Sequence, residues 1–331
     1  MLRKSTLSVA FIVAAALSLV PGLARSAETT YHALKEIPVG GAASWDYLSV
    51  DEAGRRLYVS HGTEVVVIDI DKDVVSGVIS NTPGVHGMAV APDLQRGFSS
   101  NGRENKASII DLKTLTTLSR VETGANPDGM LYEPGRQEVY MFNGRGQSAT
   151  VIDAKGGKVV ATIPLPGKPE FGVADPKAGR VYNNIEDKSV VVAIDTQKHE
   201  VVNTWPLAPG EAPTGLAIDL AHHRLIVGCG NEKMIVMDST TGKVVATVPV
   251  GKGVDAAAFD PGTQLAFTSN GTDGTVTVAH EDSPDTFTVV QTIKTERGAR
   301  TMTIDPRTHK IYLGSGQRGV ANSFKVLVYG P

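Results

Sequence analysis

The segment FDPGTQLAFT, residues 259–268, contains the pattern that decides the fold of this chain. Its second residue is the aspartate Asp260, a Pro-Gly turn follows, and the segment ends in a strand-like run with a large aromatic residue. Six other segments repeat it: SVDEAGRRLYV (49–59), VAPDLQRGFS (90–99), YEPGRQEVYM (132–141), ADPKAGRVYN (174–183), IDLAHHRLIV (218–227) and IDPRTHKIYL (304–313). A fixed period of this kind indicates a repeat architecture.

Each repeat has a marker residue at the start of its turn, and successive markers are 40 to 45 residues apart. The markers are Asp51, Ala91, Glu133, Asp175, Asp219, Asp260 and Asp305. Seven residues after each marker stands a large apolar or aromatic residue: Tyr58, Phe98, Tyr140, Tyr182, Ile226, Phe267 and Tyr312. Seven occurrences of one spacing place these residues at equivalent positions in seven structural units.

Each unit has room for four strands. The turn joins the first two strands into a hairpin. A polar loop such as residues 101–105 leads to a third strand with alternating residues, such as 65–68. A fourth strand such as 243–248 follows. No segment has the length and periodicity of a crossover helix. The sequence therefore predicts an all-β fold, a seven-bladed β-propeller with four-stranded antiparallel blades.

The two ends of the chain predict how the ring closes. The last repeat ends after its third strand, residues 324–329. The segment LKEIPVG, residues 34–40, has the pattern of a fourth strand such as ATVPVG, residues 246–251. We therefore expect the N-terminal strand to pair in the last blade, which leaves no unpaired edge there.

Three sets of motifs resemble those of the YVTN-repeat β-propeller family. They are Tyr58-Val59-Ser60-His61 with Val67-Ile68-Asp69, Pro127-Asp128-Gly129 with Val151-Ile152-Asp153, and Phe267-Thr268-Ser269-Asn270 with Thr275-Val276-Thr277-Val278. The resemblance covers essentially the whole chain after residue 26 and implies the seven-bladed fold. It implies little about function, because similar units serve in extracytoplasmic binding proteins, surface-layer proteins and propeller domains of redox enzymes. Four residues depart from the family's preference for Asn: His61, Ile185, Cys229 and Ser315.

The first 26 residues have the pattern of a secretory signal peptide. Arg3 and Lys4 precede an apolar run over residues 7–20, and Pro21 and Gly22 precede small residues. We therefore predict a signal peptide at 1–26, a single propeller domain at 27–331 and a periplasmic or secreted location. The apolar run is too short to cross a bilayer comfortably, and we predict no membrane span after signal removal. The single cysteine, Cys229, rules out an internal disulfide.

Charge and motifs narrow the function classes. The net charge of −3 gives no indication of a nucleic-acid partner. The chain lacks the C-x-x-C-H, H-E-x-x-H and G-x-S-x-G motifs and a phosphate-binding glycine loop. Two tryptophans are too few for the regular tryptophan docking of quinone-cofactor propellers. We therefore expect a binding protein more readily than an enzyme.

The repeat register predicts where a site would lie. The first strand of each blade lines the central channel, and the residue five positions before each marker stands at its entrance. These residues are Asp46, His86, Asp128, Glu170, Thr214, Asp255 and Arg300. Four carboxylates around one mouth repel one another, so a small ligand, a metal ion or a protein partner could bind there. Alternatively, the carboxylates are solvated or form ion pairs with Arg300, Lys168 or Lys252, which would relieve the same repulsion without a bound ligand.

His61 stands ten residues after its marker, on the same face. Asp46, His61 and His86 belong to neighbouring blades one and two and could bind one divalent metal ion. On this basis the first hypothesis is a non-catalytic exported binding protein. The second is a metal-dependent hydrolase or lactonase with His86 as general base. The third is an accessory propeller of a periplasmic redox system, without an identifiable cofactor residue.

Two histidine-containing segments lie on the opposite face. His222-His223 is in the first turn of the fifth repeat, and His280-Glu281-Asp282 is in a hairpin of the sixth. Adjacent side chains in a turn usually point apart into water. We interpret both segments as solvated turns.

Overall fold

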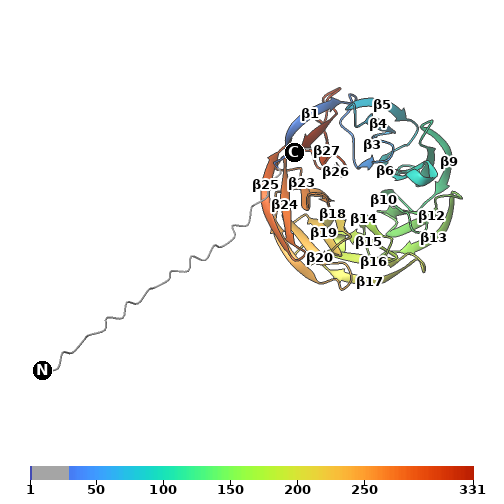
Figure 1. Cartoon of the computed structure of the whole chain (residues 1–331). Helices are drawn as coiled ribbons and strands as arrows, with labels where there is room; N and C mark the ends of the chain where they lie inside the picture. The colour runs from blue at the N-terminus through green and yellow to red at the C-terminus, as the bar shows by residue number, and fades with distance from the viewer. Residues whose placement is uncertain (2–29) are drawn as a thin grey trace.

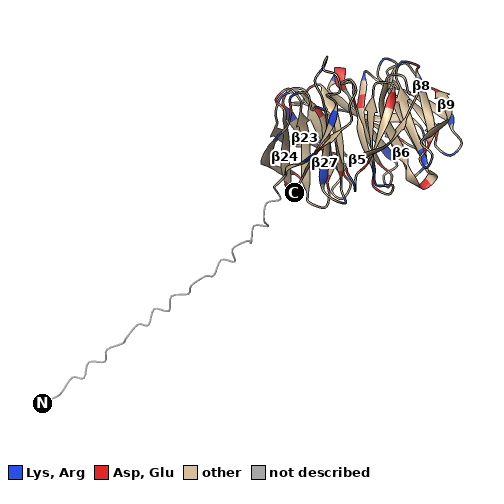
Figure 2. Cartoon of the chain, turned by 90° about the horizontal axis from the view of Figure 1, so that it is seen from above, with Lys and Arg blue, Asp and Glu red and all other residues tan. Residues whose placement is uncertain are grey.

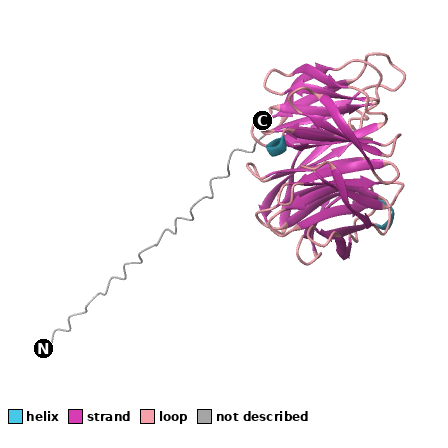
Figure 3. Cartoon of the chain, turned by 90° about the vertical axis from the view of Figure 1, so that its right-hand side faces the viewer, coloured by secondary structure: helices cyan, strands magenta, loops and turns pink. Residues whose placement is uncertain are grey.

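The computed structural model describes Met1 and residues 30–331, which form a ring of seven four-stranded antiparallel sheets (Figure 1). Figure 1 views the ring along its axis, with the colour passing once around the circle from β1 to the C-terminus. Strands make up nearly all the regular structure, and Figure 3 shows the disc from its side. The predicted fold class is confirmed.

The first four blades follow one another along the chain. Blade one contains β2 (Leu48–Asp51), β3 (Arg56–His61), β4 (Glu64–Asp69) and β5 (Val74–Ile79). Blade two contains β6 (Val85–Ala91), β7 (Arg96–Asn101), β8 (Lys106–Asp111) and β9 (Thr116–Glu122). Blade three contains β10 (Pro127–Glu133), β11 (Glu138–Asn143), β12 (Ser148–Asp153) and β13 (Lys158–Pro164). Blade four contains β14 (Pro169–Asp175), β15 (Arg180–Ile185), β16 (Val190–Asp195) and β17 (Glu200–Pro206).

The remaining three blades complete the ring. Blade five contains β18 (Pro213–Asp219), β19 (Arg224–Cys229), β20 (Lys233–Asp238) and β21 (Val244–Pro249). Blade six contains β22 (Val254–Asp260), β23 (Leu265–Asn270), β24 (Thr275–Ser283) and β25 (Thr286–Lys294). Blade seven contains β26 (Met302–Asp305), β27 (Lys310–Ser315), β28 (Lys325–Gly330) and β1 (His32–Pro38). Two short 3-10 turns, η1 (Pro92–Leu94) and η2 (Glu186–Lys188), interrupt the strands.

The N-terminal strand closes the last blade, as its sequence predicts. β1 pairs antiparallel with β28, with Ile37 opposite Val326. Ile37 is 1 % exposed and packs in a cluster with Leu57 and Phe324. β1 therefore pairs with β28, the last strand of the chain, and also packs against blade one, so it joins the two ends of the ring.

The core is divided among the blade interfaces. Seven clusters of buried apolar side chains lie between neighbouring blades of the described chain. The large residue seven positions after each marker belongs to these clusters, as Tyr58, Phe98 and Phe267 illustrate. β-branched residues such as Val65 to Val67 fill the third strands, because they pack well on a pleated surface. This packing explains why the repeat register is uniform around the ring.

The turn after each marker also has one conformation. The Asp260 carboxylate accepts the backbone N–H of Gly262, a local bond that favours a tight turn. The residue four positions after each marker has a left-handed backbone, with φ between 53° and 63°: Arg55, Gln95, Gln137, Gly179, His223, Gln264 and His309. These turns lie on the face opposite the channel mouth, which we call the bottom face.

In the side view of Figure 2, lysines and arginines are interspersed with acidic residues along the ribbon of the disc. Among the described residues, no helix has the length and apolar character needed to cross a bilayer. The predicted signal peptide at 1–26 lies outside the described residues, apart from Met1.

Candidate functional site at the channel mouth

The channel entrance is built from irregular stretches of the inner strands. In blades two to six, the regular pairing of the first two strands is broken between the first residue of the inner strand and the fourth, for example between Val85 and Met88. His86, Asp128, Glu170 and Asp255 all lie within such breaks. An irregularity of this type turns a side chain out of the sheet plane, here toward the axis.

Side chains of the second strands hold these irregular stretches. The Ser60 hydroxyl accepts the backbone N–H of Asp46 at 2.8 Å, and the Ser100 hydroxyl accepts that of Gly87 at 3.2 Å. In blade four, the Asn183 amide donates to the backbone carbonyl of Glu170 at 2.9 Å. Backbone groups that would lack partners at the breaks are thus bonded, which fixes the positions of the mouth residues.

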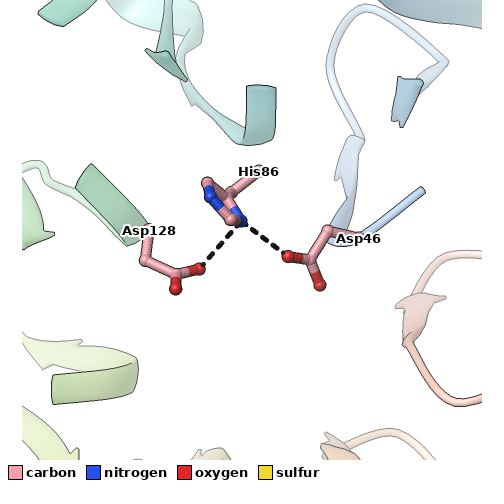
Figure 4. A group of neighbouring side chains, drawn as sticks. All are labelled: Asp46, His86 and Asp128. Atoms are coloured by element: carbon pink, nitrogen blue, oxygen red, sulfur yellow. Dashed lines mark hydrogen bonds and ion pairs between the residues drawn. The ribbon is translucent and has the colours of Figure 1, made fainter. Parts of the chain in front are cut away.

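Asp46, His86 and Asp128 come together at one side of the mouth (Figure 4). Nδ1 of His86 lies 2.8 Å from Oδ2 of Asp46 and 3.3 Å from Oδ1 of Asp128. The potential ligand atoms of the three residues all lie within 4.8 Å of one another. One imidazole nitrogen therefore sits between two carboxylates supplied by three successive blades.

The other mouth carboxylates have basic partners. Arg300 contacts Oδ2 of Asp255 at 2.5 Å and Oδ1 of Asp46 at 3.3 Å. Nζ of Lys168 contacts Oε1 of Glu170 at 2.6 Å. The ion pairs that the sequence analysis gave as the alternative to a bound ligand are therefore present for Arg300 and Lys168. Four carboxylates face two permanent cations and one histidine, so the mouth keeps an excess of negative charge whenever His86 is neutral.

The mouth shifts several pKa values. Burial raises the pKa of Asp128 to about 6, with the charges of Asp46 and Asp255 adding to the effect and His86 opposing it. Burial and the charge of Asp128 raise the pKa of Glu170 to about 8, against the opposing contact with Lys168. Burial lowers the pKa of His86, but the hydrogen bond to Asp46 and the charges of Asp128 and Asp46 outweigh it and raise the pKa overall. Protons are therefore held at this site near neutral pH.

Two aromatic rings cross the channel at the level of the mouth. Tyr47 of blade one and Phe171 of blade four meet edge to face with their centroids 4.4 Å apart. Tyr47 also places its hydroxyl 3.5 Å from Oε2 of Glu170. Gly87 makes room for this crossing, because a Cβ at that position would lie 2.8 Å from Cβ of Tyr47. The sequence register did not predict this crossing, which gives the mouth a floor.

Two pockets flank the carboxylates. One, of about 310 Å³, is lined by Asp46 and His86 together with Arg103 and Arg145. The other, of about 530 Å³, is lined by Asp255, Arg300 and Arg297. A bound molecule could therefore contact acidic groups at the axis and arginines farther out.

His61 does not join Asp46 and His86. Its Nε2 lies 2.8 Å from the carbonyl oxygen of Ala42, its Nδ1 lies 3.1 Å from Glu64, and its ring stacks on Phe324. The metal-ligand set predicted from sequence therefore needs one change, because the His61 ring is turned toward the 40–44 loop and Asp128 occupies the third position. Cys229, at the same repeat position as His61, is completely buried.

The comparisons with known proteins identify the fold alone. No protein-family model and no curated protein matches the chain. A chain of the Kuenenia stuttgartiensis hydrazine synthase matches with a TM-score of 0.72 at 15 % identity, over 93 % of this chain and 98 % of that one. A chain of a mitotic checkpoint complex matches with a TM-score of 0.76, also at 15 % identity, over 98 % and 99 %. Proteins of such different descriptions share the propeller, so the propeller does not specify a function.

Proposed function

We propose that this chain is an exported binding protein that holds a positively charged ligand at the channel mouth. The Asp46–His86–Asp128 group carries the proposal, since two carboxylates converge there on a single imidazole nitrogen. A divalent metal ion is the simplest ligand of this type. It would replace the proton on Nδ1 of His86 and would relieve the repulsion between the carboxylates.

The surrounding residues support binding more than turnover. The Tyr47–Phe171 crossing gives the ligand a fixed floor, and Arg300 fixes the carboxylates of Asp46 and Asp255. Export is proposed from the pattern of residues 1–26, and membership of the YVTN-repeat family from the motifs of the repeats. A small molecule with a cationic group, or a protein partner with an exposed lysine or arginine, would meet the same charges.

Removing one mouth carboxylate is expected to weaken metal binding at least about tenfold, because each oxygen ligand contributes directly to the affinity. The protein without residues 1–26 would be treated with a chelator and titrated with Mn²⁺. Paramagnetic broadening of the His86 ring signals in NMR would report binding at this site. Wild type and Asp128→Asn would be compared. Glu122→Gln is the control, because it also removes one negative charge but lies at an exposed position on β9.

Selective broadening of His86 in wild type and in Glu122→Gln, with a loss of affinity in Asp128→Asn, would support the proposal. Absence of broadening at millimolar Mn²⁺ would exclude a metal at this site. A cationic small molecule would then be sought by the same His86 signals.

A hydrolase is the second candidate, favoured by Glu170. A buried carboxyl group with a pKa of about 8 can donate a proton at neutral pH, as a general acid must. His86 remains the candidate base of this second function, because the carboxylates that contact its Nδ1 orient the ring and favour its protonated form. A screen of lactones and esters with wild type and Glu170→Gln would test this candidate. Turnover that Glu170→Gln abolishes would favour it over simple binding.

A further inference from the structure

On the bottom face, the residue four positions after a marker lies at the contact between two blades, and it is basic at three of the seven interfaces. The buried marker carboxylate of one blade faces the residue four positions after the marker of the next blade. Where that residue is basic, it contacts the marker: His309 lies 2.7 Å from Asp260, and Arg55 lies 2.8 Å from Asp305. His223 approaches Asp175 at 4.0 Å in the same manner.

Between blades five and six the equivalent residue is Gln264, which carries no charge. Its carbonyl oxygen accepts the backbone N–H of Glu281 at 2.9 Å, so Glu281 of β24 is brought beside the marker Asp219. Asp219 and Glu281 are each only 2 % exposed. Two acidic side chains are thus buried at an interface where the neighbouring interfaces pair an acid with a base.

One histidine lies between these two carboxyl groups. Nδ1 of His222 is 2.6 Å from Oδ2 of Asp219 and 3.1 Å from Oε1 of Glu281. The His222 side chain is 39 % exposed, so the group is open to solvent on one side. The interpretation of these segments as solvated turns is therefore wrong for Glu281, which the ring buries.

The Glu281 carboxylate is poorly satisfied by the rest of the described chain. Within the part of the chain that the structure describes, neither of its oxygens receives a hydrogen bond, and the ionisable base in contact with it is His222. The nearest arginine in the strand register, Arg224, is directed instead to Asp238 and Asp285. A buried carboxylate without a donor or a cation is costly, which points to a missing positive group.

We propose that Asp219, His222 and Glu281 form a second cation site, which takes a divalent ion of the Zn²⁺ class and joins blade five to blade six. The ligand atoms of the three residues lie within 4.8 Å of one another. Two carboxylate oxygens and one imidazole nitrogen suit Zn²⁺, which binds such ligands at about 2.0–2.2 Å. Two negative charges and a neutral imidazole balance the charge of the ion, and water can fill the remaining position from the exposed side of His222.

The alternative occupant is a proton shared by the two carboxyl groups, and zinc titration distinguishes the two. The protein without residues 1–26 would carry Asp128→Asn, so that the mouth site is weakened. After chelator treatment it would be titrated with ZnCl₂ by calorimetry, and its melting midpoint would be measured with and without zinc. We expect one zinc ion per chain and a higher melting midpoint in its presence.

Glu281→Gln removes one ligand and one buried charge while it keeps the shape of the side chain. In the same background it is expected to bind zinc at least about tenfold more weakly and to lose the zinc-dependent rise in melting midpoint. The variant should remain folded without metal, because the unsatisfied carboxylate is gone. His222→Gln is expected to weaken zinc binding in the same direction.

His223→Gln is the matched control. It changes the neighbouring histidine, which faces Asp175, and glutamine already occupies this left-handed position in three other blades. Zinc binding should be the same as in the background protein. No zinc binding in that background, or equal binding by Glu281→Gln, would overturn the proposal and would leave the shared proton as the occupant.

Discussion

Replacing Ile37 by aspartate is expected to lower the free energy of unfolding by at least about 4 kcal/mol. Ile37 is 1 % exposed on β1, opposite Val326 of β28, and it packs between the first and last blades. Loss of a buried isoleucine costs about 2–5 kcal/mol, and burial of an unpaired carboxylate adds to that cost. Urea denaturation followed by circular dichroism would measure the change.

Leu34→Asp is the control for this substitution. Leu34 lies on the same strand but is 42 % exposed, and its change should cost less than about 1 kcal/mol. Equal, small effects of the two variants would contradict the closure of the ring by β1 in solution. A large effect of Ile37→Asp alone would show that the closing strand is essential to the stability of the whole ring.

The fold was predictable because it depends on a pattern that the sequence repeats seven times. The spacing from marker to aromatic residue reflects one hairpin geometry, and each aromatic residue fills the same place between blades. The closing strand was predictable for the same reason, since residues 34–40 follow the pattern of a fourth strand and β1 spans His32–Pro38. The register also brought Asp46, His86 and Asp128 to one mouth.

The rest of the site depends on features that a repeat register does not encode. His61 stands at a position facing the mouth, but its rotamer is decided by Ala42, Glu64 and Phe324, which lie outside the pattern. The Tyr47–Phe171 crossing joins two blades that are not neighbours in the ring. A signal existed for it, because the position after each mouth residue is glycine in three blades, at 87, 129 and 215.

The burial of Glu281 has a different cause. β24 and β25 are each nine residues long, whereas the other third strands have six residues. The position of Glu281 nevertheless belongs to the repeat. The residue after the third strand is buried in blades one to five as well, and its backbone N–H bonds the carbonyl four positions after the marker, as Ile70 bonds Arg55. The sequence therefore held a signal for this contact, because the equivalent residues of blades one to five are apolar or small and blade six alone has an acid there: Ile70, Leu112, Ala154, Thr196 and Ser239 against Glu281.

Replacing Glu170 by glutamine is expected to raise stability at alkaline pH, by up to about 5 kcal/mol at pH 9, because each pKa unit of difference between the folded and unfolded states corresponds to about 1.4 kcal/mol. Burial and the charge of Asp128 raise the pKa of Glu170 to about 8, above the value of about 4.3 for an unfolded chain. Between these values the folded protein holds a proton that the unfolded chain has released. The stabilising contribution of this proton is therefore complete below about pH 4 and is lost as the pH rises through 8.

The wild-type protein should thus become less stable between pH 5 and pH 9, and Glu170→Gln should lose most of that dependence. Some dependence near pH 6 should remain, because Asp128 also has a raised pKa. Urea denaturation at several pH values would compare the two proteins with Glu122→Gln, whose exposed carboxylate should leave the wild-type profile unchanged. A Glu170→Gln variant less stable than wild type at pH 9 would mean that the 2.6 Å contact with Lys168 keeps Glu170 ionised and outweighs its burial. The mouth would then hold one more negative charge at neutral pH, and its attraction for a cation would be stronger than the raised pKa implies.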